Sequence, residues 1–102
     1  MEINIVNDFT DTPGGRYRSD GKYSGQEFLE SILLPKYKKL GEGEKLLINF
    51  DGSYGYPVSF LEEVFGGLSR KFGSEDVLNK LEFISDDEPK IIEDIKRYIK
   101  NA

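Results

Sequence analysis

The sequence predicts an α/β fold, with a mostly parallel central sheet and about three helices packed on it. The first observation is a near-continuous apolar run from Lys45 to Phe50, which is typical of a strand buried on both faces of a sheet. The second is that segments with apolar residues at helical spacing alternate with the apolar runs. The third is size, because 102 residues with a hydrophobic content of 37% suit a single domain spanning residues 1–102.

The first strand is predicted at Ile3 to Val6, a short apolar run between polar residues. Residues 7–22 are polar and contain several glycines, and their centre, Arg16-Tyr17-Arg18, is compatible with a short edge strand. A strand at this position would place the side chains of Arg16 and Arg18 on the same face.

The first helix is predicted to begin at Ser24. Ser24 and Glu27 have capping-box spacing, so each side chain can accept a hydrogen bond from a free backbone N–H group. The buried side of this helix is expected to carry Phe28, Leu29, Ile32, Leu33 and Tyr37. Pro35 removes one backbone hydrogen bond, so it is expected to kink or end the helix.

The second helix follows the strand that ends at Phe50 and a loop containing Gly and Pro. Its apolar stripe is expected to consist of Phe60, Leu61, Val64, Phe65, Leu68 and Phe72. Gly66 and Gly67 lie inside this helix, where each costs about 1 kcal/mol of helix propensity relative to Ala. These two glycines therefore predict a close approach of the helix to the sheet or to a neighbouring helix.

The last elements are a short strand at Leu81 to Ile84 and a third helix. Negative charge from Asp86, Asp87 and Glu88 suits the start of that helix, and Pro89 fits its first turn. The buried stripe of the third helix is expected to be Ile91, Ile92, Ile95, Tyr98 and Ile99.

The composition excludes several classes of site. The chain contains no Cys and no His, which rules out thiolate nucleophiles, disulfides, Cys/His zinc sites and His-based acid–base chemistry. Acidic residues such as Asp51, Glu62, Glu63 and Asp86 would have to converge to bind a metal ion, and their ordinary roles in turns and first helical turns account for them without one. We therefore expect neither a metal nor a cofactor.

The charge and hydropathy pattern limits the partners. A net charge of −5 disfavours binding to nucleic acid and is compatible with a partner that carries a basic patch. The N-terminal segment lacks the basic and apolar regions of a signal peptide, and no apolar run approaches the length of a membrane span. We expect a cytoplasmic protein without a membrane partner, as a monomer or weak dimer.

Several segments carry a family resemblance. They are Arg16, Asp20-Gly21, Ser24-Gly25 with Phe28, and then LLPKYKKL, LLINFDG, SFLEEVFGGL and LEFIS. In these segments the chain resembles the STAS-like domains of unknown function, a bacterial and phage family related in fold to sulfate-transporter and anti-sigma-factor-antagonist domains. The resemblance implies a small STAS-like sandwich and a regulatory role, as a partner-switching or scaffold module.

Ser59 has two interpretations. In anti-sigma-factor antagonists, a Ser at the start of the helix after the central strand is the regulatory phosphorylation site, and Ser59 is the residue that best matches it. The antagonist pattern has an Asp two residues earlier and a Gly just after, where this chain has Pro57 and Phe60. The other interpretation is structural: the hydroxyl of Ser59 caps the second helix by accepting from the N–H of Leu61 or Glu62.

We expect a non-enzymatic module that binds a protein partner through the loop from Asp51 to Pro57 and the start of the second helix. Tyr54 and Tyr56 are the expected anchors in this loop, because Tyr and Arg are favoured at interface centres. The remaining candidate partner-binding residues are Arg16, Arg18, Asp51 and Glu63.

Two alternatives to this binding module remain open. One is a small ligand-binding domain or enzyme that uses Asp51 or Glu63 with Arg16 at the carboxyl ends of the strands. The other is an acidic mimic of nucleic acid, which would need its carboxylates gathered in stripes on one face.

Overall fold

A parallel sheet of three strands organises the computed structural model, which describes residues 1–102. The strands are β1 (Glu2–Asn4), β2 (Leu46–Asn49) and β3 (Leu81–Ile84), in the order β1-β2-β3. Ile48 on the central strand lies opposite Ile3 on β1 and Phe83 on β3. The predicted α/β class with a mostly parallel sheet is confirmed.

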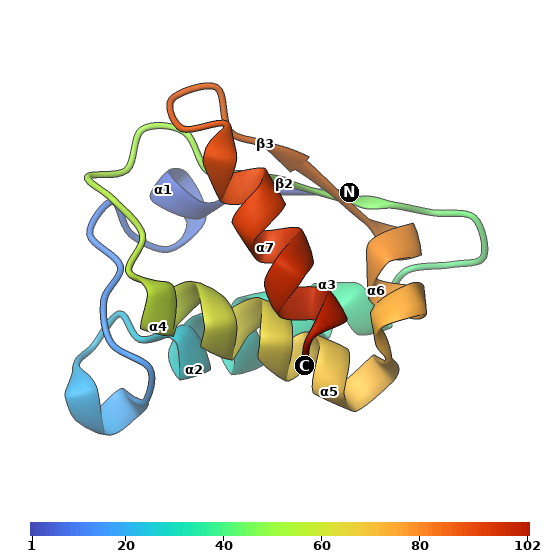
Figure 1. Ribbon diagram of the computed structural model, residues 1–102, viewed down its shortest axis with the longest axis horizontal. Coiled ribbons are helices and arrows are strands. Elements are labelled where there is room, and N and C mark those ends of the chain that lie inside the picture. The colour runs from blue at the N-terminus through green and yellow to red at the C-terminus, as the bar shows by residue number, and fades with distance from the viewer.

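The helices connect and follow these strands (Figure 1). They are α1 (Ile5–Asp8), α2 (Gly25–Phe28), α3 (Leu34–Lys38), α4 (Val58–Leu61), α5 (Gly67–Phe72), α6 (Ser74–Lys80) and α7 (Lys90–Lys100). A π-helical turn, Leu29–Leu33, joins α2 to α3, and a second, Glu62–Gly66, joins α4 to α5, so each pair forms one continuous helix. A single 3-10 turn covers Arg18–Asp20. No helix combines the length and the apolar character required to cross a membrane.

The sheet is covered by helices on one face. Leu46, Ile48 and Phe50 point to that face and are buried among 19 core residues that the sheet and helices share. Leu47 points to the other face, where it is half-buried between the exposed side chains of Glu2 and Glu82. The prediction that this strand is buried on both faces is therefore wrong. The reason is that right-handed crossovers which advance in one direction across a sheet place their helices on the same face of that sheet, so the other face stays uncovered.

The first predicted strand, Ile3 to Val6, is correct only as far as Asn4. The side chain of Asn4 accepts a hydrogen bond from the N–H of Asn7 (3.1 Å), and the carboxylate of Asp8 accepts one from the N–H of Asn4 (2.8 Å). These bonds start a helical turn at Ile5. An Asn that can cap a helix therefore overrides the apolar pattern of the residues after it.

The edge strand considered at Arg16-Tyr17-Arg18 does not form. The carboxylate of Asp20 accepts hydrogen bonds from the N–H groups of Arg16 (3.3 Å) and Tyr17 (2.9 Å). The chain instead closes into the 3-10 turn Arg18–Asp20. Local hydrogen bonds to an Asp side chain are a common alternative to strand pairing.

The first long helix begins as predicted but passes through Pro35. The hydroxyl oxygen of Ser24 accepts from the N–H of Glu27 at 3.1 Å, which confirms the predicted cap. The helix then widens into the π turn, where the N–H of Leu34 donates to the carbonyl of Leu29, five residues back. This wider turn lies just before Pro35, at the point where a regular helix would meet the Pro ring. The helix therefore continues past Pro35, and the alternative in which Pro35 ends it is wrong.

The predicted close approach to a neighbouring helix is present at Gly67 but not at Gly66. A Cβ atom at Gly67 would lie 2.9 Å from Cδ2 of Leu29 on the neighbouring helix, whereas a Cβ atom at Gly66 would overlap the carboxylate of Glu62, which belongs to the same continuous helix. A close contact with backbone, not anticipated from the sequence, occurs at Gly25, where a Cβ atom would lie 2.8 Å from the carbonyl oxygen of Phe60. The start of α2 therefore packs directly on the backbone of α4.

The contact at Gly25 predicts a large effect of a single methyl group. We expect Gly25→Ala to lower the free energy of unfolding by about 2 kcal/mol, because a backbone carbonyl cannot move aside as a side-chain end can. Gly14→Ala is the matched control, since a Cβ atom at Gly14 meets nothing within 4 Å. Urea unfolding of both variants measures the difference, and equal stability would show that α2 and α4 are not held at this distance.

Candidate functional site

The segment from Gly15 to Ser24 is attached to the start of α2. The N–H groups of Gly25 and Gln26 donate to the carbonyls of Gly15 (3.0 Å) and Arg16 (2.9 Å). With the cap from Ser24, these bonds satisfy the free N–H groups of the first turn. This helix start therefore serves to anchor the segment, and its N–H groups are not free to bind an anion.

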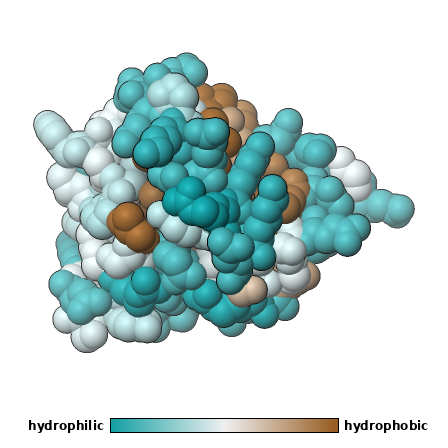
Figure 2. All heavy atoms as spheres, in the orientation of Figure 1, coloured by the Kyte–Doolittle hydropathy of each residue, from teal (hydrophilic) through white to brown (hydrophobic).

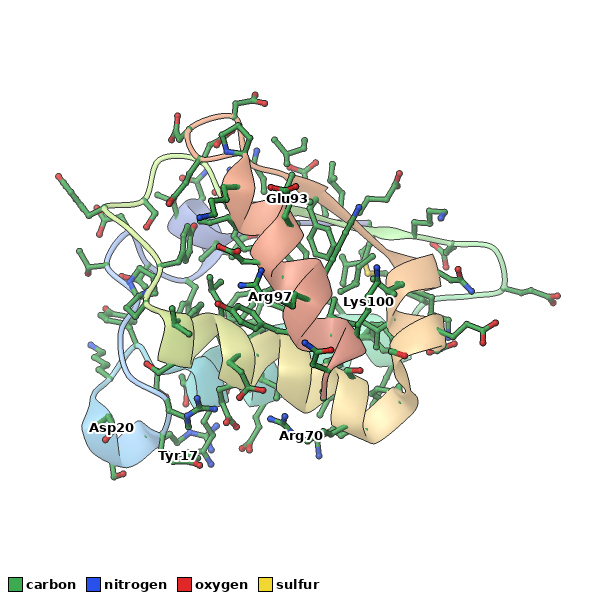
Figure 3. The ribbon with its side chains drawn as sticks, in the orientation of Figure 1. Tyr17, Asp20, Arg70, Glu93, Arg97 and Lys100 are labelled. Atoms are coloured by element: carbon green, nitrogen blue, oxygen red, sulfur yellow. The ribbon has the colours of Figure 1, made fainter.

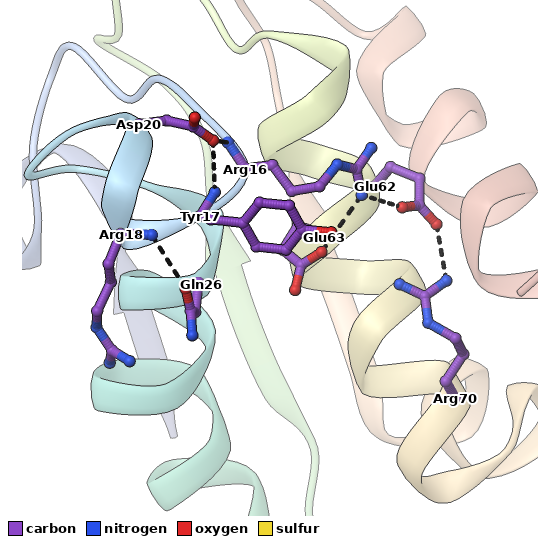
Figure 4. Close-up of polar contacts among 8 residues, drawn as sticks. All are labelled: Arg16, Tyr17, Arg18, Asp20, Gln26, Glu62, Glu63 and Arg70. Carbon is purple, nitrogen blue, oxygen red and sulfur yellow. Dashed lines mark hydrogen bonds and ion pairs between the residues drawn. The ribbon is translucent and has the colours of Figure 1, made fainter.

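Arg16 extends from this segment to α4 and its continuation (Figure 4). Its Nη1 atom lies 2.5 Å from Oε1 of Glu62 and 3.3 Å from Oε1 of Glu63, while Oε2 of Glu62 lies 2.9 Å from Nη1 of Arg70. We call Arg16, Glu62, Glu63 and Arg70 the Arg16 cluster. The structure thus brings together Arg16 and Glu63, which the sequence had singled out. It adds Glu62, which the sequence had grouped only with other carboxylates, and Arg70, which it had not indicated.

Arg18 makes a second set of ion pairs on the exposed side of α2. Its Nε atom lies 2.7 Å from Oε1 of Glu27 and its Nη1 atom 2.6 Å from Oε1 of Glu30. The backbone N–H of Arg18 also donates to the side chain of Gln26 at 3.0 Å. Arg16 and Arg18 therefore leave the same segment in different directions, one toward α4 and one along α2.

The electrostatics of the Arg16 cluster favour permanent charges. A hydrogen bond from Arg70, assisted by one from Arg16, lowers the pKa of Glu62 against the opposing effect of burial. The hydrogen bond to Glu62 likewise raises the pKa of Arg16. A general acid or base needs a pKa near the working pH. The cluster is thus suited to holding two segments together rather than to transferring protons.

The lowered pKa of Glu62 predicts a pH-dependent contribution to stability. A carboxyl group with a lowered folded-state pKa stabilises the fold above its ordinary value of 4.5 and loses that effect as the pH falls through the folded value. We expect Glu62→Gln to lower the free energy of unfolding at neutral pH by about 1 kcal/mol, with the difference shrinking below pH 4.5.

Urea titrations at several pH values measure this difference. Glu93→Gln, on the exposed face of α7, is the control and should behave like the unmodified protein (Figure 3). A difference between Glu62→Gln and the unmodified protein that stays constant from neutral to acidic pH would contradict the assigned ion pairs.

A second cluster lies at the carboxyl end of β2, away from Arg16. The N–H of Asp87 donates to Oδ1 of Asp51 (2.9 Å), and the N–H of Gly52 donates to Oδ2 of Asp87 (2.8 Å). These reciprocal bonds tie the loop after β2 to the loop after β3. Asp51 therefore has a structural partner, and the structure does not place it in the Arg16 cluster. No group of three or more acidic side chains is arranged to hold a metal ion.

The residues Ser53–Pro57, which we call the Tyr54 loop, present one aromatic side chain to solvent. The side chain of Tyr54 is 85% exposed. The backbone of the loop is nevertheless held in place: the N–H of Tyr54 donates to the carbonyl of Asp11 (2.9 Å), and the N–H of Gly55 donates to Oγ of Ser53 (2.9 Å). The exposed ring is thus carried by an ordered backbone.

Tyr56 differs from the expectation that both tyrosines are exposed. It is half-buried, its hydroxyl donates to the carbonyl of Phe50 at 2.6 Å, and its ring meets that of Phe50 edge-on at 5.3 Å. Burial raises the pKa of Tyr56 to about 12. The sequence pattern of alternating Tyr and Gly cannot show that this ring folds back onto the end of β2. Tyr56 therefore supports the loop from beneath, while Tyr54 remains free.

Thr12 and Pro13 complete this surface, although the sequence offered no signal for them. Together with Tyr54, Gly55, Tyr56 and Pro57 they line an open groove of about 410 Å³. Pro13 is buried and Thr12 is exposed, so the groove has a fixed floor and a polar rim.

The face of the molecule that carries α7 differs from the groove. Charged side chains such as Glu93, Arg97 and Lys100 project from α7 (Figure 3). The face seen in Figure 2 is mostly hydrophilic, with only scattered hydrophobic residues.

Ser59 does not cap the second helix, contrary to the structural prediction. The helix begins two residues earlier than a cap at Ser59 would place it, at Val58, and Pro57 occupies the cap position without a side-chain hydrogen bond. Pro57 has extended backbone angles (φ −61°, ψ 147°), and its carbonyl accepts from the N–H of Leu61 at 3.1 Å. Because the helix starts before Ser59, this residue lies inside the first turn and not at the position from which a side chain caps the free N–H groups.

The position of Ser59 inside the first turn predicts a small effect of its removal. We expect Ser59→Ala to change the free energy of unfolding by less than about 0.5 kcal/mol, as for a surface residue without a capping role. Ser24→Ala is the comparison, because Ser24 does cap its helix and should cost about 1 kcal/mol. Equal losses in thermal or urea unfolding would show that Ser59 caps after all.

The resemblance seen in the sequence is supported by comparison with known families. A family model described as STAS-like domain of unknown function (DUF4325) matches residues 24–90. The match begins at the capping Ser24, so Arg16 and Asp20 lie outside it, while α4, the Tyr54 loop and Ser59 lie inside it. No curated protein and no solved structure gives a significant match.

Proposed function

We propose that this chain, which belongs to the family of STAS-like domains of unknown function, is a non-enzymatic module that binds a protein partner through the Tyr54 loop and the start of α4. The observation that carries the proposal is the 85% exposure of Tyr54 on a loop with a hydrogen-bonded backbone. A large aromatic side chain on an ordered loop can be buried by a partner at a small cost in conformational entropy.

The ion pairs support a binding role over a catalytic one. The enzyme alternative uses Arg16 with Asp51 or Glu63. Arg16 is paired with both Glu62 and Glu63, Asp51 accepts from the N–H of Asp87 instead, and the pKa of Glu62 is shifted away from neutrality. Arg16 and Arg18 each contact two carboxylates, so their first role is to hold the segment from Gly15 to Ser24. The proposal includes the cytoplasmic location and the bacterial or phage source expected from the sequence.

Regulation through Ser59 forms the finer part of the proposal. A phosphate on Ser59 would add negative charge in the first turn of α4, two residues after the Tyr54 loop and close in sequence to Glu62 and Glu63. Such a charge would change the surface that a partner meets, which is the physical basis of partner switching. Intact-mass spectrometry of the protein from its native host tests this directly, since an unmodified mass under all growth conditions contradicts it.

The binding role predicts a specific loss on removal of one ring. A photo-crosslinking residue in the Tyr54 loop identifies the partner in the native host, and affinity is then measured with the purified partner. We expect Tyr54→Ala to weaken binding at least about tenfold without changing the melting temperature. Tyr17→Ala is the control, since Tyr17 is also exposed (51%) but lies in another segment. Equal affinities of the two variants for the partner would show that the interface does not include Tyr54.

A further inference from the structure

The loops around the Tyr54 groove carry negative charge without compensating positive charge. Three segments meet at the carboxyl ends of the strands: residues 7–13 after β1, 50–59 after β2 and 85–89 after β3. They contain six carboxylates and no Lys or Arg; the carboxylates are Asp8, Asp11, Asp51, Asp86, Asp87 and Glu88. Basic residues lie just outside these segments: Arg16 follows the first by three residues, and Lys90, at the start of α7, directly follows the third.

None of these six carboxylates takes part in an ion pair. The ion pairs of the protein involve Glu27, Glu30, Glu62, Glu63, Asp76 and Asp94 instead. Asp8, Asp51 and Asp87 accept hydrogen bonds from backbone N–H groups, which fixes their positions without cancelling their charge. The six carboxylates are therefore not paired with any Lys or Arg side chain, and all of them except the half-buried Asp51 are exposed.

Contacts connect this charge to the groove. The carbonyl of Asp11 accepts from both the N–H of Tyr54 (2.9 Å) and the hydroxyl of Ser53 (3.2 Å), so Asp11 lies at the rim of the groove beside Thr12. The charges of Asp51 and Asp87 are near enough to the hydroxyl of Tyr56 to contribute to its raised pKa, below the larger effect of burial. Carboxylates from three loops therefore lie close to residues that line the groove.

The side chains that line the groove favour one class of peptide. They are formed by the rings of Tyr54 and Tyr56 and by Pro13 and Pro57. Grooves lined by aromatic and Pro rings are typical receptors for extended, proline-containing chains, whose backbone is already ordered before binding. The surrounding carboxylates would attract Lys or Arg in the same chain and speed its approach.

Building on the binding role proposed above, we propose that the Tyr54 groove receives an extended, proline-containing peptide segment of the partner that also carries Lys or Arg. The proline and neighbouring apolar groups pack against the exposed ring of Tyr54 and the groove surface formed by Tyr56 and Pro57. The basic side chains lie toward Asp11 and toward the loops of Asp51 and Asp87. This assignment names the chemical class of the partner segment, which the binding role alone leaves open.

Selection from a random nonapeptide library tests the assignment, with three forms of the full chain as targets. The first is the unmodified protein. The second is the triple variant Asp11→Asn, Asp86→Asn and Glu88→Gln, whose side chains make no hydrogen bond or ion pair that would be lost. The third, a control, changes Glu2, Glu82 and Glu93 to Gln; these exposed residues lie on β1, β3 and α7. Both triple variants reduce the net charge from −5 to −5 + 3 = −2.

We expect the unmodified protein and the control to select peptides with proline and Lys or Arg, and the loop variant to lose that preference. By fluorescence anisotropy, the best selected peptide should bind the loop variant at least about tenfold more weakly than the control, since both carry the same net charge. Raising the ionic strength from about 0.05 M to about 0.3 M should also weaken its binding to the unmodified protein several-fold.

The outcomes separate this assignment from the binding role on which it rests. Selection of neutral or acidic peptides, no selection at all, or equal affinity of the loop variant and the control would overturn the assignment. The binding role itself is judged by Tyr54→Ala with the crosslinked partner. If that variant still loses binding while the selected peptides are neutral, the interface stands and only the class of partner segment is wrong.

Discussion

The contact between Gly25 on α2 and the backbone of Phe60 on α4 sets the arrangement on which the rest of the molecule depends. A residue with a Cβ atom at this point would meet a carbonyl oxygen at 2.8 Å, so only Gly lets the two crossover helices start side by side. Both helices then cover the same face of the sheet, with the Phe28 and Phe60 rings 6.0 Å apart in the core between them. Their close starts also bring the segments that precede them to one end of the fold.

Charge is used in two different ways at that end. In the Arg16 cluster, Arg16 from the segment before α2 is paired with carboxylates of the π turn after α4, and Arg70 of α5 pairs with one of them. These pairs join the segment from Gly15 to Ser24 to the helix and add little net charge. At the carboxyl ends of the strands, Asp11, Asp51 and Asp87 stay unpaired by cations. Paired charges stabilise locally, whereas unpaired charges extend their field into solvent and guide association. The second arrangement is the one suited to recognition.

The two tyrosines of the loop show how one short segment combines support and recognition. Tyr56 is fixed by its hydrogen bond to the end of β2 and by the ring of Phe50, while Tyr54, two residues earlier, is left in solvent. In a regular extended chain, side chains two residues apart point to the same side, so Tyr54 and Tyr56 would be expected to lie together. The Gly55 between them has φ of 141°, a conformation that L side chains rarely adopt, and this turn directs the two rings apart.

The sequence by itself determined the class of fold, the places of β2 and β3, the cap at Ser24 and the close approach at Gly67, because periodicity, capping spacing and helix propensity are local properties. It did not determine that Ile5 begins a helix, that Pro57 replaces Ser59 at the start of α4, or that one face of the sheet stays uncovered. Each of these was decided by competition between local hydrogen bonds or by the path of the crossovers. The Arg16 cluster and the Tyr54 groove were likewise decided only in tertiary structure. Each joins the segment 12–16 to residues more than 40 positions later, as with the 46 between Arg16 and Glu62, and no local pattern records which distant residues will meet.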